Sequence, residues 1–89
     1  MNNHKNRHKT IVTEQMLTSI AQRVIRAAQA HFSRDLLRYS DDRWEHEINP
    51  WIDRWITERY MFPQPELAFD LDDIISIELE NDEEGTSNG

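Results

Sequence analysis

The sequence predicts a small, mainly α-helical protein, and three observations support this fold class. Apolar residues recur every three or four positions between Leu17 and Leu36, which is the spacing of an amphipathic helix. No glycine precedes Gly85, so most of the chain lacks the residue that most often ends helices. The 89 residues are enough for one domain with a modest core. We therefore expect two to three packed helices.

The first predicted helix spans residues 13–39. Thr13 has the position of an N-cap, and Glu14 follows in the first turn, where a negative charge is favourable beside the helix dipole. No glycine or proline stops the pattern before its end, although Ser33 could cap a new helix, so a break near this residue stays open. Residues 1–9 are basic and polar, and we expect them to form a disordered N-terminal tail.

The second predicted helix spans residues 41–61 and is interrupted at Pro50. Ser40 has the position of its N-cap. Two alternatives remain at the proline. Asn49 could cap a new helix with proline at its first position, or one helix could pass through the proline with a kink. The apolar spacing keeps its phase across Pro50, which favours a kinked helix or two closely abutting helices.

The acidic segment 66–80 has a different period. Its apolar residues occupy alternate positions, interrupted at Asp73: Leu67, Phe69, Leu71, Ile75, Ile77 and Leu79. This spacing predicts a short β-strand or hairpin, or an extended segment. A single longer strand and a short helix from Asp72 stay open. A strand here could add to the sheet of a partner protein. We place the single domain at residues 10–80 and expect a disordered acidic tail at 81–89.

Several functional classes lack their usual residues. The chain has no cysteine and no glycine-rich phosphate loop. His4 and His8 have helical ligand spacing, but no further ligands follow at the spacing of a metal site. No serine lies in a nucleophile-elbow context. We therefore predict a protein that is not an enzyme, with no cofactor and no metal. No apolar run is long enough to span a membrane, and we expect a cytoplasmic protein.

The aromatic residues are concentrated between Phe32 and Phe69. Aromatic side chains supply much of the burial in a small core, so we expect Trp44 and one of the other two tryptophans to be buried. Trp51 adjoins Ile52, and Trp55 adjoins Ile56. Neighbouring residues on a helix point in different directions, so one member of each pair should be partly exposed.

Charge is distributed unevenly, because residues 1–34 have a formal charge of +5 and residues 35–89 a formal charge of −12. The function that we predict is that of a small inhibitor or modulator that binds another protein, such as a basic or nucleic-acid-binding one, through an acidic, aromatic-rich surface. Small size, acidity and a lack of catalytic motifs are common in inhibitors from phages and mobile elements. The predicted contact residues are Trp51, Arg54, Trp55, Arg59, Tyr60, Phe62, Asp70, Asp72, Asp73, Glu78 and Glu80.

Two alternative functions stay open. The tryptophan-rich helix could form a homodimer or a larger assembly. The sixteen acidic residues after Arg34 could instead imitate the phosphates of DNA and occupy the nucleic-acid groove of another protein. Direct binding of nucleic acid is not expected, because the acidic part of the chain would repel phosphate.

Overall fold

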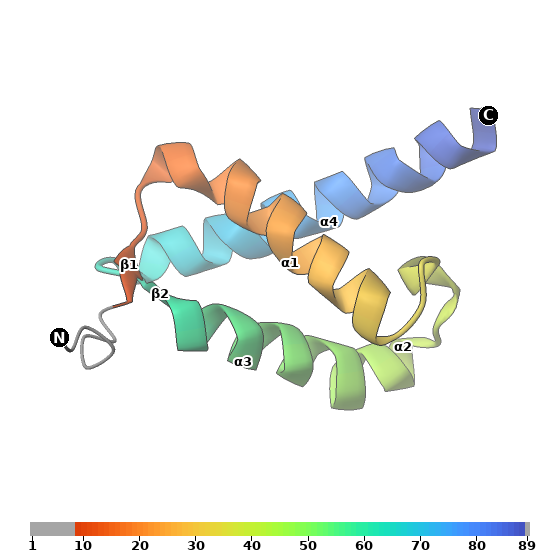
Figure 1. Ribbon diagram of the computed structural model, residues 1–89, viewed down its shortest axis with the longest axis horizontal. Coiled ribbons are helices and arrows are strands. Elements are labelled where there is room, and N and C mark those ends of the chain that lie inside the picture. The colour runs from red at the N-terminus through yellow and green to blue at the C-terminus, as the bar shows by residue number, and fades with distance from the viewer. Residues whose placement is uncertain (1–8, 89) are drawn as a thin grey trace, which may run out of the picture.

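Three helices dominate the structure and confirm the mainly α fold class (Figure 1). The computed structural model describes the backbone of residues 9–88 and the side chains of residues 9–81. The helices are α1 (Leu17–His31), α3 (Asn49–Arg59) and α4 (Pro65–Asn88). Helix α1 packs against both α3 and α4. The turn that follows α3 joins it to α4, and the two helices diverge with distance from this turn (Figure 1). The predicted tail at 1–9 lies almost entirely outside the described residues, as do the side chains of the tail at 81–89.

The first helix is shorter than the predicted range 13–39. A 3₁₀ turn, η2 (Glu14–Met16), precedes α1, and Thr13 occupies the predicted N-cap position before this turn, although its side chain makes no capping bond. Its carbonyl accepts a bond from the Met16 N–H at 3.0 Å instead. The chain leaves the helix after His31, and Ser33 Oγ accepts a bond from the Asp35 N–H at 3.3 Å. The break near Ser33 is therefore confirmed, because this hydroxyl stabilises a turn there.

A second short helix region leads from the break to Pro50. It begins with a 3₁₀ turn, η3 (Leu36–Arg38), and continues with one turn of α-helix, α2 (Asp41–Arg43). Ser40 Oγ accepts a bond from the Arg43 N–H at 3.2 Å, which confirms Ser40 as the N-cap.

The chain passes through Pro50 as one continuous helical path. A π-helical turn, η4 (Trp44–Ile48), joins α2 to α3, and the Asn49 N–H donates to the carbonyl of Trp44, five residues back. Asn49 itself has helical angles (φ −60°, ψ −44°), so it does not cap a new helix. Proline lacks an N–H, and its ring clashes with the carbonyl four residues earlier in a regular α-helix. The wider π turn makes room for the ring. Helix α3 ends at Arg59, two residues before the predicted boundary at 61.

A two-stranded parallel sheet, which the sequence did not predict, connects the start of the described chain to the end of α3. Strand β1 (Thr10–Ile11) pairs with β2 (Tyr60–Met61), with Thr10 opposite Tyr60. The Val12 N–H donates to the carbonyl of Met61 at 3.0 Å and extends the pairing by one bond. The sheet fixes where α3 ends relative to α1.

The segment 66–80 is part of helix α4, so the predicted β-strand, hairpin or extended segment is wrong. The buried residues recur at every fourth position: Leu67, Leu71, Ile75 and Leu79. Phe69 and Ile77 completed the apparent alternation, but they are 71% and 53% exposed on the other side of the helix. The fourfold spacing of the buried residues was therefore misinterpreted as a strand's alternation. Because the segment is helical, it cannot add a strand to the sheet of a partner protein.

The core lies along α1, between α3 and α4. Small residues on α1 let the other helices approach closely, and Ala21, Val24 and Ala28 have no exposed surface. Ile48, Ile52 and Ile56 cover α1 from one side, and the fourth-position row of α4 covers it from the other. In the described part of the chain, no helix has both the length and the apolar character needed to cross a membrane.

Candidate functional site: an acidic groove between two helices

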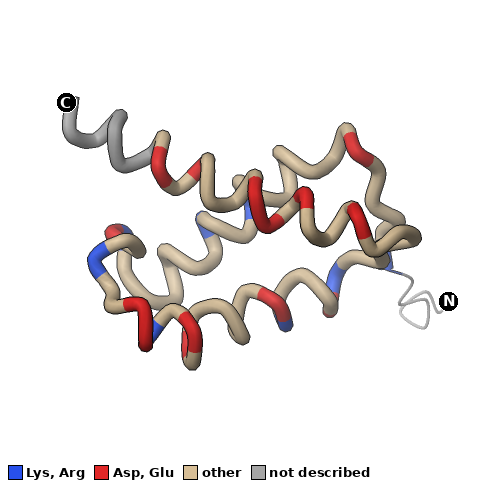
Figure 2. Tube along the Cα trace, turned by 180° about the vertical axis from the view of Figure 1, so that it is seen from behind, with Lys and Arg blue, Asp and Glu red and all other residues tan. Residues whose placement is uncertain are grey.

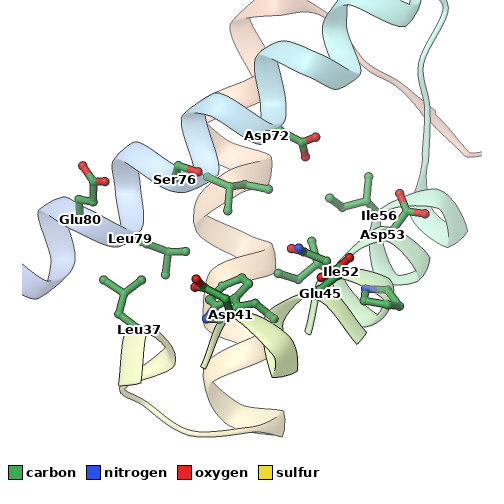
Figure 3. Close-up of a pocket in the computed structure, with 14 residues that line it drawn as sticks. Leu37, Asp41, Glu45, Ile52, Asp53, Ile56, Asp72, Ser76, Leu79 and Glu80 are labelled. Atoms are coloured by element: carbon green, nitrogen blue, oxygen red, sulfur yellow. The ribbon is translucent and has the colours of Figure 1, made fainter. Parts of the chain in front are cut away.

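A groove with a volume of about 890 Å³ lies between the α2–α3 region and α4 (Figure 3). We call it the acidic groove and define it by its lining residues: Leu37, Asp41, Trp44, Glu45, Asn49, Pro50, Ile52, Asp53, Ile56, Asp72, Ile75, Ser76, Leu79 and Glu80. It exists because α3 and α4 each pack on α1 and diverge from one another.

Two polar rows form the rims of the acidic groove. On the α2–α3 side the row consists of residues at intervals of four, namely Asp41, Glu45, Asn49 and Asp53. On α4 the row is Asp72, Ser76 and Glu80, again at intervals of four. Residues four apart lie above one another on a helix. Each polar row therefore runs beside a row of buried apolar residues on the same helix.

The floor of the groove is apolar. Ile52 and Ile56 from α3 meet Ile75 and Leu79 from α4, and each of the four side chains is only 6% exposed. Little water therefore reaches the bottom of the groove, and the apolar surface that an occupant could still cover belongs mainly to the more exposed Leu37 and the half-buried Trp44.

Leu37 is the exposed large apolar residue of the groove lining. It is 38% exposed and points toward Leu79 across the groove (Figure 3). Trp44 is half-buried, and its indole N–H donates to the carbonyl of Leu36 at 3.0 Å, which fixes the ring in the groove wall. A fixed aromatic surface of this kind is typical of positions that contribute strongly to binding.

The charges around the groove are all negative. Five carboxylates line it and no lysine, arginine or histidine does. Desolvation raises the pKa of Asp72 above its ordinary value of 3.8, and the negative charges of Asp53 and Asp73 raise this pKa further. Asp53 lies on α3 and Asp72 on α4, so the two walls repel each other across the groove (Figure 3).

No cation of the described chain neutralises α4. The ion pairs among the described residues are Arg43–Glu47 at 2.8 Å, His46–Asp42 at 3.3 Å and Arg59–Glu58 at 3.6 Å. None of them includes a residue of α4. Figure 2 shows acidic residues and no basic ones among the described residues of α4. The groove therefore carries negative charge that a partner could neutralise.

The predicted acidic contact residues fall into three environments on α4. Asp72 and Glu80 line the groove. Asp70 and Asp73 are exposed and lie outside the lining. Glu78 is half-buried beside α1, where its carboxylate accepts a bond from Gln22 Nε2 at 3.5 Å.

The predicted aromatic contact residues lie outside the groove. Trp51 stacks on His31, with ring centroids 4.9 Å apart, and meets Phe32 edge-on at 5.6 Å. Trp51 and Trp55 are half-buried whereas Ile52 and Ile56 are buried, which confirms the expectation for these neighbouring pairs. All three tryptophans pack against the core but stay half-buried, so the expectation that two of them would be buried is wrong. Trp51 thus serves the contact between α3 and the end of α1, and neither tryptophan lines the groove.

The remaining predicted residues lie near the end of α3. The Arg59 guanidinium lies 4.2 Å from the centroid of the Trp55 ring. Tyr60 is buried, and its hydroxyl accepts a bond from Arg23 Nη1 at 3.2 Å. Phe62 is half-buried and Arg54 is exposed. The structure thus divides the predicted contact residues into two groups. The aromatic residues and arginines lie on or just after α3, outside the groove, and Asp72 and Glu80 line the acidic groove.

Sequence reasoning missed the groove wall on the α2–α3 side. Asp41, Glu45 and Asp53 were not predicted contact residues. The interval of four that joins Asp41, Glu45 and Asp53 was a signal that could have identified them. Their position opposite α4 was not readable, because it depends on how both helices pack on α1.

Comparison with protein-family models, with characterised proteins and with solved structures gives no significant match to this chain. Among the described residues, no three histidine, aspartate or glutamate side chains converge as metal ligands would.

Proposed function

We propose that the protein is a non-catalytic binding protein that docks on another protein through the acidic groove and modulates or blocks that partner. The observation that carries this proposal is the combination of an apolar floor with carboxylates on both walls and no cation in the lining. Binding of a positively charged partner would neutralise the repulsion between Asp53 and Asp72. It would also cover apolar surface at the Leu37 end.

The composition of the groove favours a protein over other ligands. Nucleic acid would be repelled by the five carboxylates. The only hydroxyl in the lining belongs to Ser76, and no histidine in the lining is available to activate it as a nucleophile. An apolar floor with charged rims resembles the arrangement of protein interfaces, in which the centre is apolar and the edge polar.

An affinity pull-down from the native host's lysate tests this proposal. The bait is used in three forms: the natural chain, the Asp72→Lys variant, and the matched Asp70→Lys variant. Asp70 lies on the same helix outside the groove lining, so both variants change the net charge equally. We expect a partner that the natural chain and Asp70→Lys retain and that Asp72→Lys loses. A partner retained equally by all three forms would contradict a role for the groove.

The two alternative functions predict other outcomes of the same experiment. A DNA mimic uses its whole array of exposed acids, so Asp70→Lys and Asp72→Lys should weaken binding about equally, and DNA should compete. Assembly through the tryptophan-rich helix should give a stable oligomer that neither variant changes. Trp51 is already stacked on His31, so this second alternative would have to use the part of the ring that remains exposed.

A further inference from the structure

We infer that the occupant of the acidic groove is a positively charged, amphipathic α-helix of the partner protein. This inference rests on the proposed function and adds the chemistry and shape of the partner segment. The contacts that carry it are the two polar rims, the apolar floor and the difference between the two ends of the groove.

The walls of the groove favour a helix over an extended segment. Both walls are helices, whose backbone groups bond within the helix, so the groove offers no free strand edge to an occupant. An extended peptide would place unpaired N–H and C=O groups on the floor formed by Ile52, Ile56, Ile75 and Leu79. A helix satisfies its own backbone bonds and presents only side chains to that floor.

The packing around α1 leaves a position for such a helix. Helices α3 and α4 flank α1, and the groove opens between them on the side away from α1 (Figure 3). A helix laid there would contact both walls, as the fourth member of a small bundle does. The α4 wall from Asp72 to Glu80 is about 12 Å long at 1.5 Å per residue, which corresponds to two to three turns of an occupant.

The two ends of the groove define what the occupant presents. Leu37 and Leu79 lie toward one end of the groove, and Asp53 and Asp72 lie toward the other (Figure 3). Leu79 and Asp72 are seven residues apart on α4, about 10 Å or two turns. The occupant should therefore present a large apolar residue and an arginine or lysine about two turns apart on one face.

The charge of the remaining rim completes the pattern. Asp41 and Glu80 lie toward the Leu37 end (Figure 3), so basic residues on the flanks of the occupant's apolar face would meet carboxylates on both sides. A helix with a neutral polar face would leave these charges and the repulsion at Asp72 unrelieved. Charge complementarity therefore selects a basic amphipathic helix.

Synthetic peptides test the inference directly. The first peptide has about 18 residues and capped termini, so that it is long enough to form a helix. It has leucines on one face, lysines elsewhere, and an arginine seven positions from a central leucine. A second peptide has the same composition with its leucines dispersed, and a third has a proline in the middle. Binding is measured by isothermal titration calorimetry with the full chain at low salt.

We expect the first peptide to bind at least tenfold more tightly than the other two. The Asp53→Asn, Asp72→Asn double variant should weaken this binding about tenfold, whereas the matched Asp70→Asn, Asp73→Asn variant should change it less than threefold. Amide shifts in a nuclear magnetic resonance titration should cluster at the groove lining. Equal binding of the three peptides, or equal loss in the two double variants, would overturn the inference.

The same peptide separates this inference from the proposed function. If the lysate partner depends on Asp72 but the first peptide does not displace it, the groove binds a protein segment of another shape, and only the inference fails. If no partner depends on Asp72, the proposed function itself fails.

Discussion

Asp53 on α3 and Asp72 on α4 face each other across the acidic groove, and the charge of Asp53 helps to raise the pKa of Asp72. Desolvation is the larger cause of this raised pKa. The described chain places no cation between the two carboxylates. The negative charge of Asp72 therefore lowers the stability of the free protein, and a positively charged partner would remove this effect.

The first prediction concerns stability and pH. Because its folded-state pKa is raised, Asp72 binds its proton more tightly in the folded state, and its ionisation destabilises the fold. Asp72→Asn should therefore raise the melting temperature at pH 7. The gain should shrink as the pH falls through the raised pKa and vanish below the ordinary value of 3.8.

Thermal unfolding followed by circular dichroism between pH 3 and pH 7 measures this effect. Asp70→Asn is the matched control, because Asp70 and Asp72 are both exposed residues of α4 and only Asp72 lines the groove. A gain at Asp70 as large as the gain at Asp72 would show that overall charge, and not the groove, is responsible.

The second prediction tests the helical phase of α4. Ile75 is 6% exposed and Ile77 is 53% exposed, although the two would share a face in a β-strand. Ile75→Ala should lower the free energy of unfolding by about 2–4 kcal/mol, and Ile77→Ala by less than about 0.5 kcal/mol. Urea denaturation measures both values. Similar losses at both positions would contradict the helix.

The third prediction compares two residues that the sequence placed at helix starts. Ser40 Oγ accepts the Arg43 N–H, whereas the Thr13 side chain makes no capping bond. Ser40→Ala should therefore lower the free energy of unfolding by about 1 kcal/mol, and Thr13→Ala should change it by only a few tenths. The reverse order in chemical denaturation would mean that the Thr13 hydroxyl caps the first helical turn after all.

The fourth prediction concerns the pH dependence of partner binding. A cationic partner favours the ionised form of Asp72, so its affinity should fall as the pH drops through the raised pKa of this residue. The cationic peptide and calorimetry measure the trend. In the Asp72→Asn variant the dependence should be weaker, and an unchanged dependence there would exclude Asp72 as its source.

The helical class, the cap at Ser40 and the break near Ser33 could be predicted because each depends on local sequence. The full length of helix α4 could not be predicted, and a short helix from Asp72 was only one open alternative, because Phe69 and Ile77 lie between members of the buried row and imitate a strand's alternation. The fourfold spacing of its buried residues becomes visible only when the exposed Phe69 and Ile77 are set aside, and the sequence does not show which apolar residues are exposed. The course through Pro50 was one of two stated alternatives, and the π turn that makes it possible lies in residues with no distinctive signature.

The candidate site was predicted in part. Asp72 and Glu80 were predicted contact residues and do line the groove, because acidity marked α4 as a whole. Asp53 was not a predicted contact residue, because its position opposite α4 depends on how both helices pack on α1. Trp51 was predicted as a contact residue from residue type alone, and its stacking on His31 depends on the packing of α3 against the end of α1.

Site-specific photo-crosslinking in the native host tests the central claim most directly. A photoreactive phenylalanine derivative replaces Ser76, which lines the groove, or Ser19, which is exposed on α1 outside the lining. We predict that the derivative at position 76 crosslinks one partner protein, that the attached peptide is a basic amphipathic helix, and that position 19 gives no such product. The same partner crosslinked equally from both positions, or only from position 19, would contradict binding in the acidic groove.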